Sequence, residues 1–459
     1  MLQDKTGNTF NTIWRGWNGS GAKSHPAGAI VRLKGYYGAS NSIFRINGSD
    51  TIYRDFELLY SDPTRSFNYS VYQTTGEPGA RPDAVDSRGP RNKFVNLVIH
   101  DACVGLGLWE QAQGNEAYGN ILYNNGHVDT LRGHCQGLYM QNADASQPKK
   151  VTDVISFNNF DMGMKAFGYA GGLDGFQFLG VTSFNNGSPA AFSGNPSGFS
   201  SNYRRTGLFV GGDQPGRDIS VRNSYLYMPP GTTIGNRLFA LGWAGNGTNN
   251  INVVAQDNYV AGGNEALSFD LWNSATVTGN TFFATTSSGS ANQRIVDANT
   301  PGSYNYTWNN NTYFDATNGS ESFVRNGTAH TFSSWKSATG FDSGSTYTVG
   351  RPTGIKIFIR PNQFEAGRAH ISIYNWDRAN SVAVNLSLTG LTNGQAYEIR
   401  NAQNYFGALV LTGTYSASSP VVNISMTSAA ATAVATPIGQ GSTPATTLPE
   451  FGVFVVVPR

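Results

Sequence analysis

A few side chains in the first half of the chain could transfer protons on a sugar. Lys165 and Tyr139 could abstract and return a proton, and His134 could do either. Arg88 or Arg132 could neutralise a carboxylate. Together these groups are suited to β-elimination on a uronate, which needs a base at C5 and charge stabilisation at the carboxylate.

Hydrolysis is the alternative chemistry, and it would need two carboxylates about 5–9.5 Å apart. Asp86 is the one acidic residue that occupies the same place in its repeat as Tyr139 and Lys165 do in theirs. Other acidic residues supply further candidates at Glu110, Glu116, Asp129, Asp174, Asp213 and Asp270. The residue types therefore leave lyase and hydrolase open.

The candidate residues lie on a repeated phrase between Gly105 and Gly187. Gly107, Gly137 and Gly163 open the phrases, 30 and 26 residues apart, and an aromatic-Asn-Asn turn closes each one. A unit of this length cannot bury its own apolar face, so it must stack on copies of itself. Asparagine at the turns is expected to enter the left-handed region and to hydrogen-bond along the stack. We predict a right-handed parallel β-helix of nine or ten coils.

Aligning the phrases on these glycines predicts two columns of outward side chains. The first contains Asp86, Trp109, Tyr139, Lys165 and Phe209, and the second Arg88, Gln111, Gln141, Phe167 and Gly211. Neighbouring strands are about 4.8 Å apart, so the members of a column touch. Aromatic rings beside polar groups suit pyranose rings, which pack on aromatics through C–H faces.

We therefore expect catalysis and substrate binding on one outer face. The catalytic candidates are Lys165, Tyr139, His134 and Asp86, and the substrate-binding candidates are Trp109, Gln111, Gln141, Arg88, Arg132 and Phe209. Structural roles compete with these functions: the aromatics could form a plain ladder, and the lysine stem could simply pack in solvent. A loop at 188–203 interrupts the repeat and could form one wall of a groove.

Composition narrows the classes of protein. Charged residues make up 13% of the 459 residues, there are 55 glycines, and the net charge is +2. This favours many short strands and turns and argues against a nucleic-acid partner. No apolar run is long enough for a membrane span. Cys103 and Cys135 lie about one coil apart and could be bridged or free. No cofactor or metal motif occurs, and no compact acidic cluster argues for calcium.

The domain organisation follows from where the repeat starts and stops. We expect a cap at 1–40, the β-helix at 41–320, a linker at 321–353 and an antiparallel β-sandwich at 354–459. Short strands with turn signals every 8–15 residues indicate the sandwich. Residues 428–450 are of low complexity, and the apolar strand after them is expected to pair inside the sandwich.

The motifs of residues 40–315 resemble those of the pectin-lyase-like right-handed parallel β-helix superfamily. They are similar to bacterial β-helix proteins with the texts N-L-x-I-H-D, E-x-Y-G-N-I-x-Y-N-N-G and H-x-x-G-[IL]-Y-x-Q-N, which here begin at Asn96, Glu116 and His134. The pectate-lyase segments R-x-P-x-x-R and W-I-D-H are absent, as are N-T-D, D-D, G-H-G and R-I-K of polygalacturonases. The resemblance therefore implies the fold and a carbohydrate-active class, but neither of those two activities.

These observations lead to one expected function and one rival. We expect a secreted enzyme that cleaves a polysaccharide in a groove on the outer face of the solenoid. Met1 to Asp4 carry no apolar leader, so we expect a mature form. The rival is a non-catalytic β-helix that binds glycans or has a structural role at a cell surface.

Overall fold

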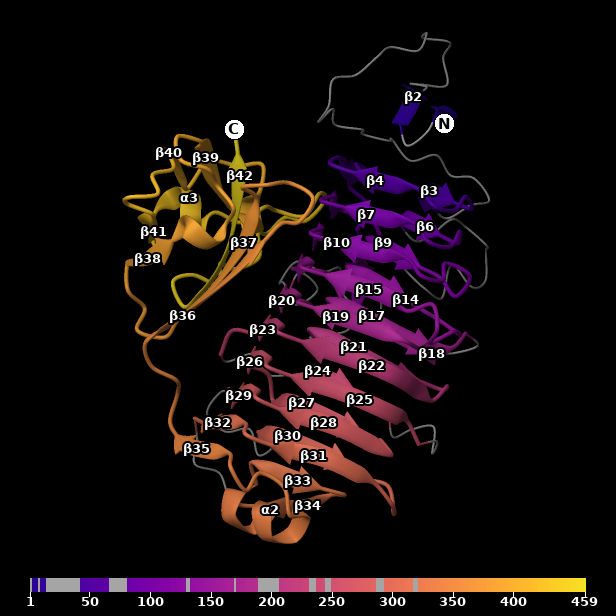
Figure 1. The fold of residues 1–459 in the computed structure, drawn as a ribbon, viewed down its shortest axis with the longest axis vertical. Coiled ribbons are helices and arrows are strands. Elements are labelled where there is room, and N and C mark those ends of the chain that lie inside the picture. The colour runs from indigo at the N-terminus through magenta and orange to yellow at the C-terminus, as the bar shows by residue number, and fades with distance from the viewer. Residues whose placement is uncertain are drawn as a thin grey trace.

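The computed structural model describes residues 2–6, 9–13, 42–65, 81–128, 133–168, 171–188, 206–230, 237–243, 249–285, 293–316 and 321–459. In the predicted cap, the described backbone is β1 (Leu2–Thr6) and β2 (Thr9–Ile13), which pair antiparallel. Three long parallel sheets follow and then a C-terminal antiparallel sheet, so the chain is all-β in these parts (Figure 1). The stack is consistent with a parallel β-helix.

The chain visits the three sheets in turn and contributes one strand to each. Sheet 1 comprises β3 (Ser42–Ile46), β6 (Asp83–Ser87), β9 (Leu106–Leu108), β14 (Leu138–Met140), β17 (Met164–Gly168), β21 (Leu208–Gly212), β24 (Arg237–Leu241), β27 (Glu265–Asp270), β30 (Arg294–Asn299), β33 (Phe323–Arg325) and β34 (Thr328–His330). Sheet 2 comprises β4 (Ile52–Arg54), β7 (Lys93–Val95), β10 (Glu116–Tyr118), β15 (Lys149–Thr152), β19 (Phe176–Leu179), β22 (Gly216–Arg222), β25 (Ile251–Gln256), β28 (Ser274–Thr278) and β31 (Asn305–Asn309), with β18 (Leu173–Asp174) beside β22. Sheet 3 comprises β5 (Glu57–Leu59), β8 (Val98–His100), β11 (Ile121–Tyr123), β16 (Ile155–Phe157), β20 (Thr182–Phe184), β23 (Tyr225–Tyr227), β26 (Tyr259–Ala261), β29 (Thr281–Ala284), β32 (Thr312–Asp315) and β35 (Thr346–Val349).

Apolar side chains from all three sheets fill the interior of the stack. On sheet 1, Leu138 and Met140 of β14 are fully buried, while Tyr139 between them faces outward. This alternation follows from the two-residue period of a strand. The expected division into inward and outward residues is therefore confirmed on β14 and on β17 of the same sheet.

Asparagines at the turns stabilise the stack as the sequence predicted. Asn124, Asn158 and Asn185 have φ between 51° and 53°, in the left-handed region. The asparagine after each of them forms a buried ladder, in which Asn125 Nδ2 donates to Asn159 Oδ1 at 3.0 Å. Asn159 Nδ2 in turn donates to Asn186 Oδ1 at 2.9 Å. These amides satisfy backbone groups that would otherwise be buried without partners.

Residues 321–353 differ from the expected linker. They contain β33, β34, helix α2 (Phe332–Thr339) and β35, and both β33 and β35 extend the parallel sheets. Thr331 caps α2 by accepting from Ser334 N, and Gly340 ends the helix in the left-handed region. Helix α2 inserts the fully buried Trp335 into the end of the interior. The parallel sheets therefore continue to Val349.

The C-terminal unit packs two sheets together. Its five-stranded sheet has the order β36 (Ile355–Pro361), β37 (Ala369–Asn375), β42 (Phe451–Pro458), β39 (Ala396–Asn401) and β40 (Leu411–Thr414). A two-stranded sheet, β38 (Ser381–Asn385) with β41 (Val421–Ser425), shares a core with it. Three short helices, η3 (Leu386–Leu388), η4 (Ala402–Asn404) and α3 (Ala429–Thr432), complete the unit. The last strand, β42, pairs with β37 and β39, as its apolar sequence predicted.

The opposite face of the C-terminal sheet covers sheet 3, alongside the N-terminal half of the stack (Figure 1). The aromatic residues before the Asn-Asn turns, Tyr123, Phe157 and Phe184, stack on one another and belong to this interface. Tyr374 Oη donates to the carbonyls of Leu226 and Tyr259 at 3.0 and 3.1 Å. The aromatic residues that close the repeats are therefore buried beneath the C-terminal unit.

Candidate functional site

The outer side of sheet 1 brings Tyr139 and Lys165 together. They are direct partners in the register of β14 and β17, and Lys165 pairs in turn with Phe209 of β21. Asp86 lies two strands from Tyr139 in the same column, and Gly107 lies between them. The predicted first column is thus present, with one exception.

The exception is Trp109, whose place in that column is taken by Gly107. The glycine equivalent to Gly137 and Gly163 is Gly105, where an added Cβ would meet the Gly137 carbonyl oxygen at 2.6 Å. The predicted alignment was therefore wrong by two residues at this coil. Trp109 lies in the second column, beside Gln141. Gln111 lies in an exposed turn outside both columns.

The indole ring of Trp109 nevertheless reaches the first column, because Gly107 has no side chain to occupy that place. An added Cβ at Gly107 would lie 3.3 Å from the indole Nε1 of Trp109. The Trp109 and Tyr139 rings are 5.2 Å apart and tilted by 53°, a favourable arrangement for an aromatic pair. The guanidinium of Arg88 lies over the Trp109 ring, 5.4 Å from its centre.

A hydrogen bond orients Tyr139 as a proton donor. Gln141 Nε2 donates to Tyr139 Oη at 3.1 Å, which leaves the phenolic hydrogen available to another acceptor. Burial raises the pKa of Tyr139, while the bond from Gln141 lowers it by a smaller amount. The phenol therefore keeps its proton at neutral pH.

Lys165 lies over two rings of the same face. Its Nζ is 4.1 Å from the centre of the Phe167 ring and 5.9 Å from that of Tyr139. Phe167 also packs against Phe209, which in turn meets Trp243. We call Trp109, Tyr139, Phe167, Phe209 and Trp243 the aromatic face.

Asp86 and Phe209 support this face from beneath its surface. Asp86 is 3% exposed and binds Arg45 Nε at 2.7 Å and Arg88 Nε at 3.0 Å. Because both carboxylate oxygens are engaged, Asp86 holds Arg88 in place and is poorly disposed to act on a substrate. Phe209 is 5% exposed and packs with Met162 and Ala240. It therefore supports the neighbouring rings.

His134 lies in neither column. It belongs to β13 (Gly133–His134), which pairs antiparallel with β12 (His127–Val128), and its ring stacks on His127 at 5.3 Å. Arg132 and nearly all of the 188–203 loop lie outside the described residues. Cys103 and Cys135 form a disulfide, so the choice that the sequence left open is a bridge.

A buried lysine holds the turn that carries Trp109. Lys149 of β15 is fully buried, and its Nζ donates to the carbonyls of Trp109 and Ala112 at 2.8 and 2.6 Å. Burial lowers the pKa of Lys149 to about 7, and the charge of Glu110 opposes this shift only in part. This role could not be predicted from the sequence, because nothing near Lys149 points to a turn some forty residues earlier.

We expect Lys149 to make the protein more stable as the pH rises above 7. The pKa of Lys149 is about 7 in the folded chain and 10.5 when the side chain is not buried, as in the unfolded chain. Between these two pH values the unfolded chain therefore binds more protons than the folded chain. The free energy of unfolding of wild type should rise relative to Lys149→Met, by at most about 1.4 kcal/mol per pH unit. Urea unfolding of both proteins between pH 7 and 9 measures this difference, and parallel curves would contradict it.

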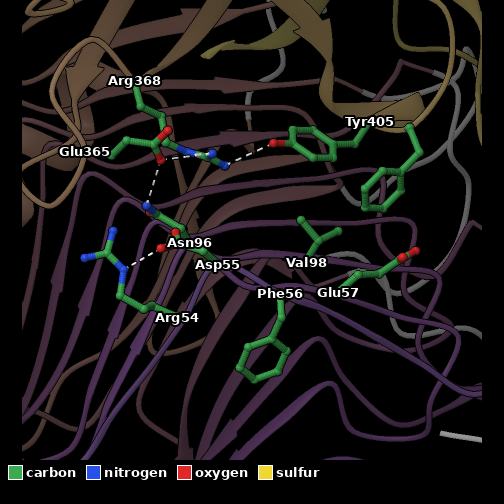
Figure 2. Close-up of a pocket in the computed structure, with 10 residues that line it drawn as sticks. Arg54, Asp55, Phe56, Glu57, Asn96, Val98, Glu365, Arg368 and Tyr405 are labelled. Carbon is green, nitrogen blue, oxygen red and sulfur yellow. Dashed lines mark hydrogen bonds and ion pairs between the residues drawn. The ribbon is translucent and has the colours of Figure 1, made fainter. Parts of the chain in front are cut away.

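A second site lies where sheet 3 meets the C-terminal unit (Figure 2). A cavity of about 430 Å³ is lined by Arg54, Asp55, Phe56, Glu57, Asn96, Val98, Glu365, Arg368, Tyr405 and Phe406. Most of its polar groups bind one another: Asn96 donates to Glu365, and Arg368 donates to Glu365 and Tyr405 (Figure 2). Of the polar groups that line this cavity, Glu57 Oε2 and Arg368 Nε have no hydrogen-bond partner among the described residues. The sequence did not indicate this site, because its residues lie about three hundred positions apart.

Behind this cavity is a buried ionic chain. His100 binds Glu57 Oε1 through Nε2 at 2.9 Å and Asp101 Oδ2 through Nδ1 at 2.6 Å, and Asp101 also binds Arg65. Burial disfavours the imidazolium, but the hydrogen bonds and charges of Asp101 and Glu57 outweigh it and raise the pKa of His100. Ile438 N donates to Asp101 as well, so these buried ionic groups attach the C-terminal unit to the stack. A structural role for His100 accounts for these contacts.

Comparison of the chain with protein-family models, with curated proteins and with solved structures gives no match. None of the helices in the described ranges is long and apolar enough to cross a membrane. The function is therefore inferred from the geometry of the aromatic face.

Proposed function

We propose that the protein is a secreted polysaccharide lyase that acts on a uronate-containing chain along the aromatic face. In this proposal the three parallel sheets are the sides of a right-handed parallel β-helix of the pectin-lyase-like type. The C-terminal unit is a β-sandwich accessory domain. The sequence motifs and the order in which the chain visits the sheets support this interpretation of the fold.

The observation that carries the proposal is the pairing of Tyr139 with Lys165 among aromatic rings. Trp109 and Phe167 flank the pair along the strands and offer flat surfaces for pyranose rings. Arg88, held by Asp86, lies at one side and can bind a uronate carboxylate.

The chemical steps assign one role to each member of the pair. In its deprotonated form Lys165 takes the C5 proton, and the C5–H electrons form the C4–C5 double bond as the C4–O bond breaks. The departing oxygen takes the phenolic proton of Tyr139. Because the two residues are register partners, the lysine ammonium can then return its proton to the phenolate, and both groups are restored.

Digestion of polysaccharides tests the proposal directly. We expect acidic polysaccharides from plant, algal and microbial sources to give products with the ultraviolet absorbance of an unsaturated uronate, while neutral polysaccharides give none. Reducing ends without that absorbance would replace elimination by hydrolysis. Binding to the aromatic face without cleavage of any member of the panel would favour the non-catalytic rival.

A further inference from the structure

We propose that Cys103, His127 and Cys135 form a binding site for one Zn²⁺ when their disulfide is reduced. The three ligand atoms, two Sγ and the Nδ1 of His127, lie within 4.8 Å of one another. The site is separate from the pair Tyr139 and Lys165, and it does not depend on the proposed lyase activity.

The distances match those of a tetrahedral zinc centre. His127 Nδ1 lies 3.7 Å from Cys135 Sγ and 4.0 Å from Cys103 Sγ. Zinc bonds of about 2.3 Å to sulfur and 2.0–2.1 Å to nitrogen place a sulfur and a nitrogen ligand about 3.6 Å apart. The nitrogen is therefore already near its position, and only the two sulfur atoms must separate, to about 3.8 Å.

Three different segments hold the ligands in place. Cys103 follows β8, and its N–H donates to the Pro82 carbonyl at 2.8 Å. His127 lies on β12 and is 6% exposed, with its ring stacked on that of His134. Cys135 has φ of 71°, an uncommon conformation for a residue with a side chain, which persists where the surroundings enforce it. Because Cys135 is partly exposed, an ion can enter and keep a water as its fourth ligand.

The disulfide is converted to the zinc site in two steps, reduction and metal binding. A phosphine and one water reduce the disulfide to two thiols and leave the phosphine oxide. Zn²⁺ then binds both sulfurs as thiolates and releases two protons. An oxidant that restores the bridge removes both thiolate ligands and expels the ion. Thiolate and imidazole ligands select zinc over calcium or magnesium.

Metal titration of the full chain tests the site. Protein reduced with a phosphine and then freed of it should bind one equivalent of Zn²⁺, and Co²⁺ in its place should give thiolate-to-metal charge-transfer absorption. Oxidised protein should show neither. His127→Gln keeps both cysteines and should bind at least about 100-fold more weakly, since loss of outer-shell partners alone costs 10–100-fold.

His330→Gln is the matched control, because His330 is a partly exposed histidine far from this cluster, on β34. It should bind Zn²⁺ as wild type does. Equal binding by reduced and oxidised wild type, or by His127→Gln and wild type, would overturn the proposal. Circular dichroism follows the fold throughout. A reduced chain that loses its β-sheet spectrum and does not regain it with Zn²⁺ would overturn the proposal as well.

Discussion

Replacing Lys165 by alanine, or Tyr139 by phenylalanine, should lower turnover of the acidic polysaccharide by about two to four orders of magnitude. Each change removes one proton-transfer group and leaves the interior of the stack intact, because both side chains face outward on sheet 1. The free energy of unfolding should change by no more than about 0.5 kcal/mol. Product formation followed by ultraviolet absorbance gives the rate, and denaturant unfolding gives the stability.

Lys150→Ala provides the matched control for the lysine. Lys150 is also an outward lysine on a parallel strand, but it lies on sheet 2, away from the aromatic face. Its loss should leave turnover within about twofold of wild type, since it contacts no reacting group. If both Lys165→Ala and Tyr139→Phe fold and keep full activity, the aromatic face is a structural ladder and the reaction occurs elsewhere.

Asn159→Ala should destabilise the protein by about 3 to 5 kcal/mol. The fully buried Asn159 accepts from Asn125 N and Nδ2 and donates to Leu122 O, Ser156 Oγ and Asn186 Oδ1. Alanine replaces none of these bonds, so several polar groups would be left buried without partners. Guanidinium unfolding of wild type and variant, followed by circular dichroism, measures the loss.

Asn305→Ala is the control for this prediction. Asn305 is an exposed asparagine of β31, and its backbone N–H still donates to Asn273 O after the change. It should shift the free energy of unfolding by less than about 0.5 kcal/mol. A comparable loss in both variants would mean that the ladder adds nothing beyond the ordinary preference for asparagine in this chain.

The repeat could be predicted because each coil obeys local rules. Alternation along each strand distinguishes inward from outward residues, and the Asn-Asn turn recurs in every phrase. The error at Trp109 has the same origin. Gly105 and Gly107 are two residues apart, so either could be aligned with Gly137. A shift of two residues leaves every side chain on the same face of the strand. The sequence therefore predicted the correct face but the wrong neighbours.

Contacts between distant segments could not be predicted in this way. The bond from Lys149 to the Trp109 turn depends on where strand β15 passes that turn in three dimensions. The cavity at Glu57 exists only because residues near 365 and 405 dock on sheet 3. The pairing of Asp86 with two arginines, one of them a coil away at Arg45, likewise changes a candidate acid into a support.

The ending of the stack has a consequence for how the protein behaves at high concentration. A parallel sheet with a bare last strand presents a row of unpaired N–H and C=O groups, and any other chain with a free strand can add to it. Here β34 folds back antiparallel on β33, and α2 seals the interior beside them with Trp335. The turned strand ends the parallel order of sheet 1 and the helix covers the apolar opening, which disfavours the addition of another chain to sheet 1 at this terminus.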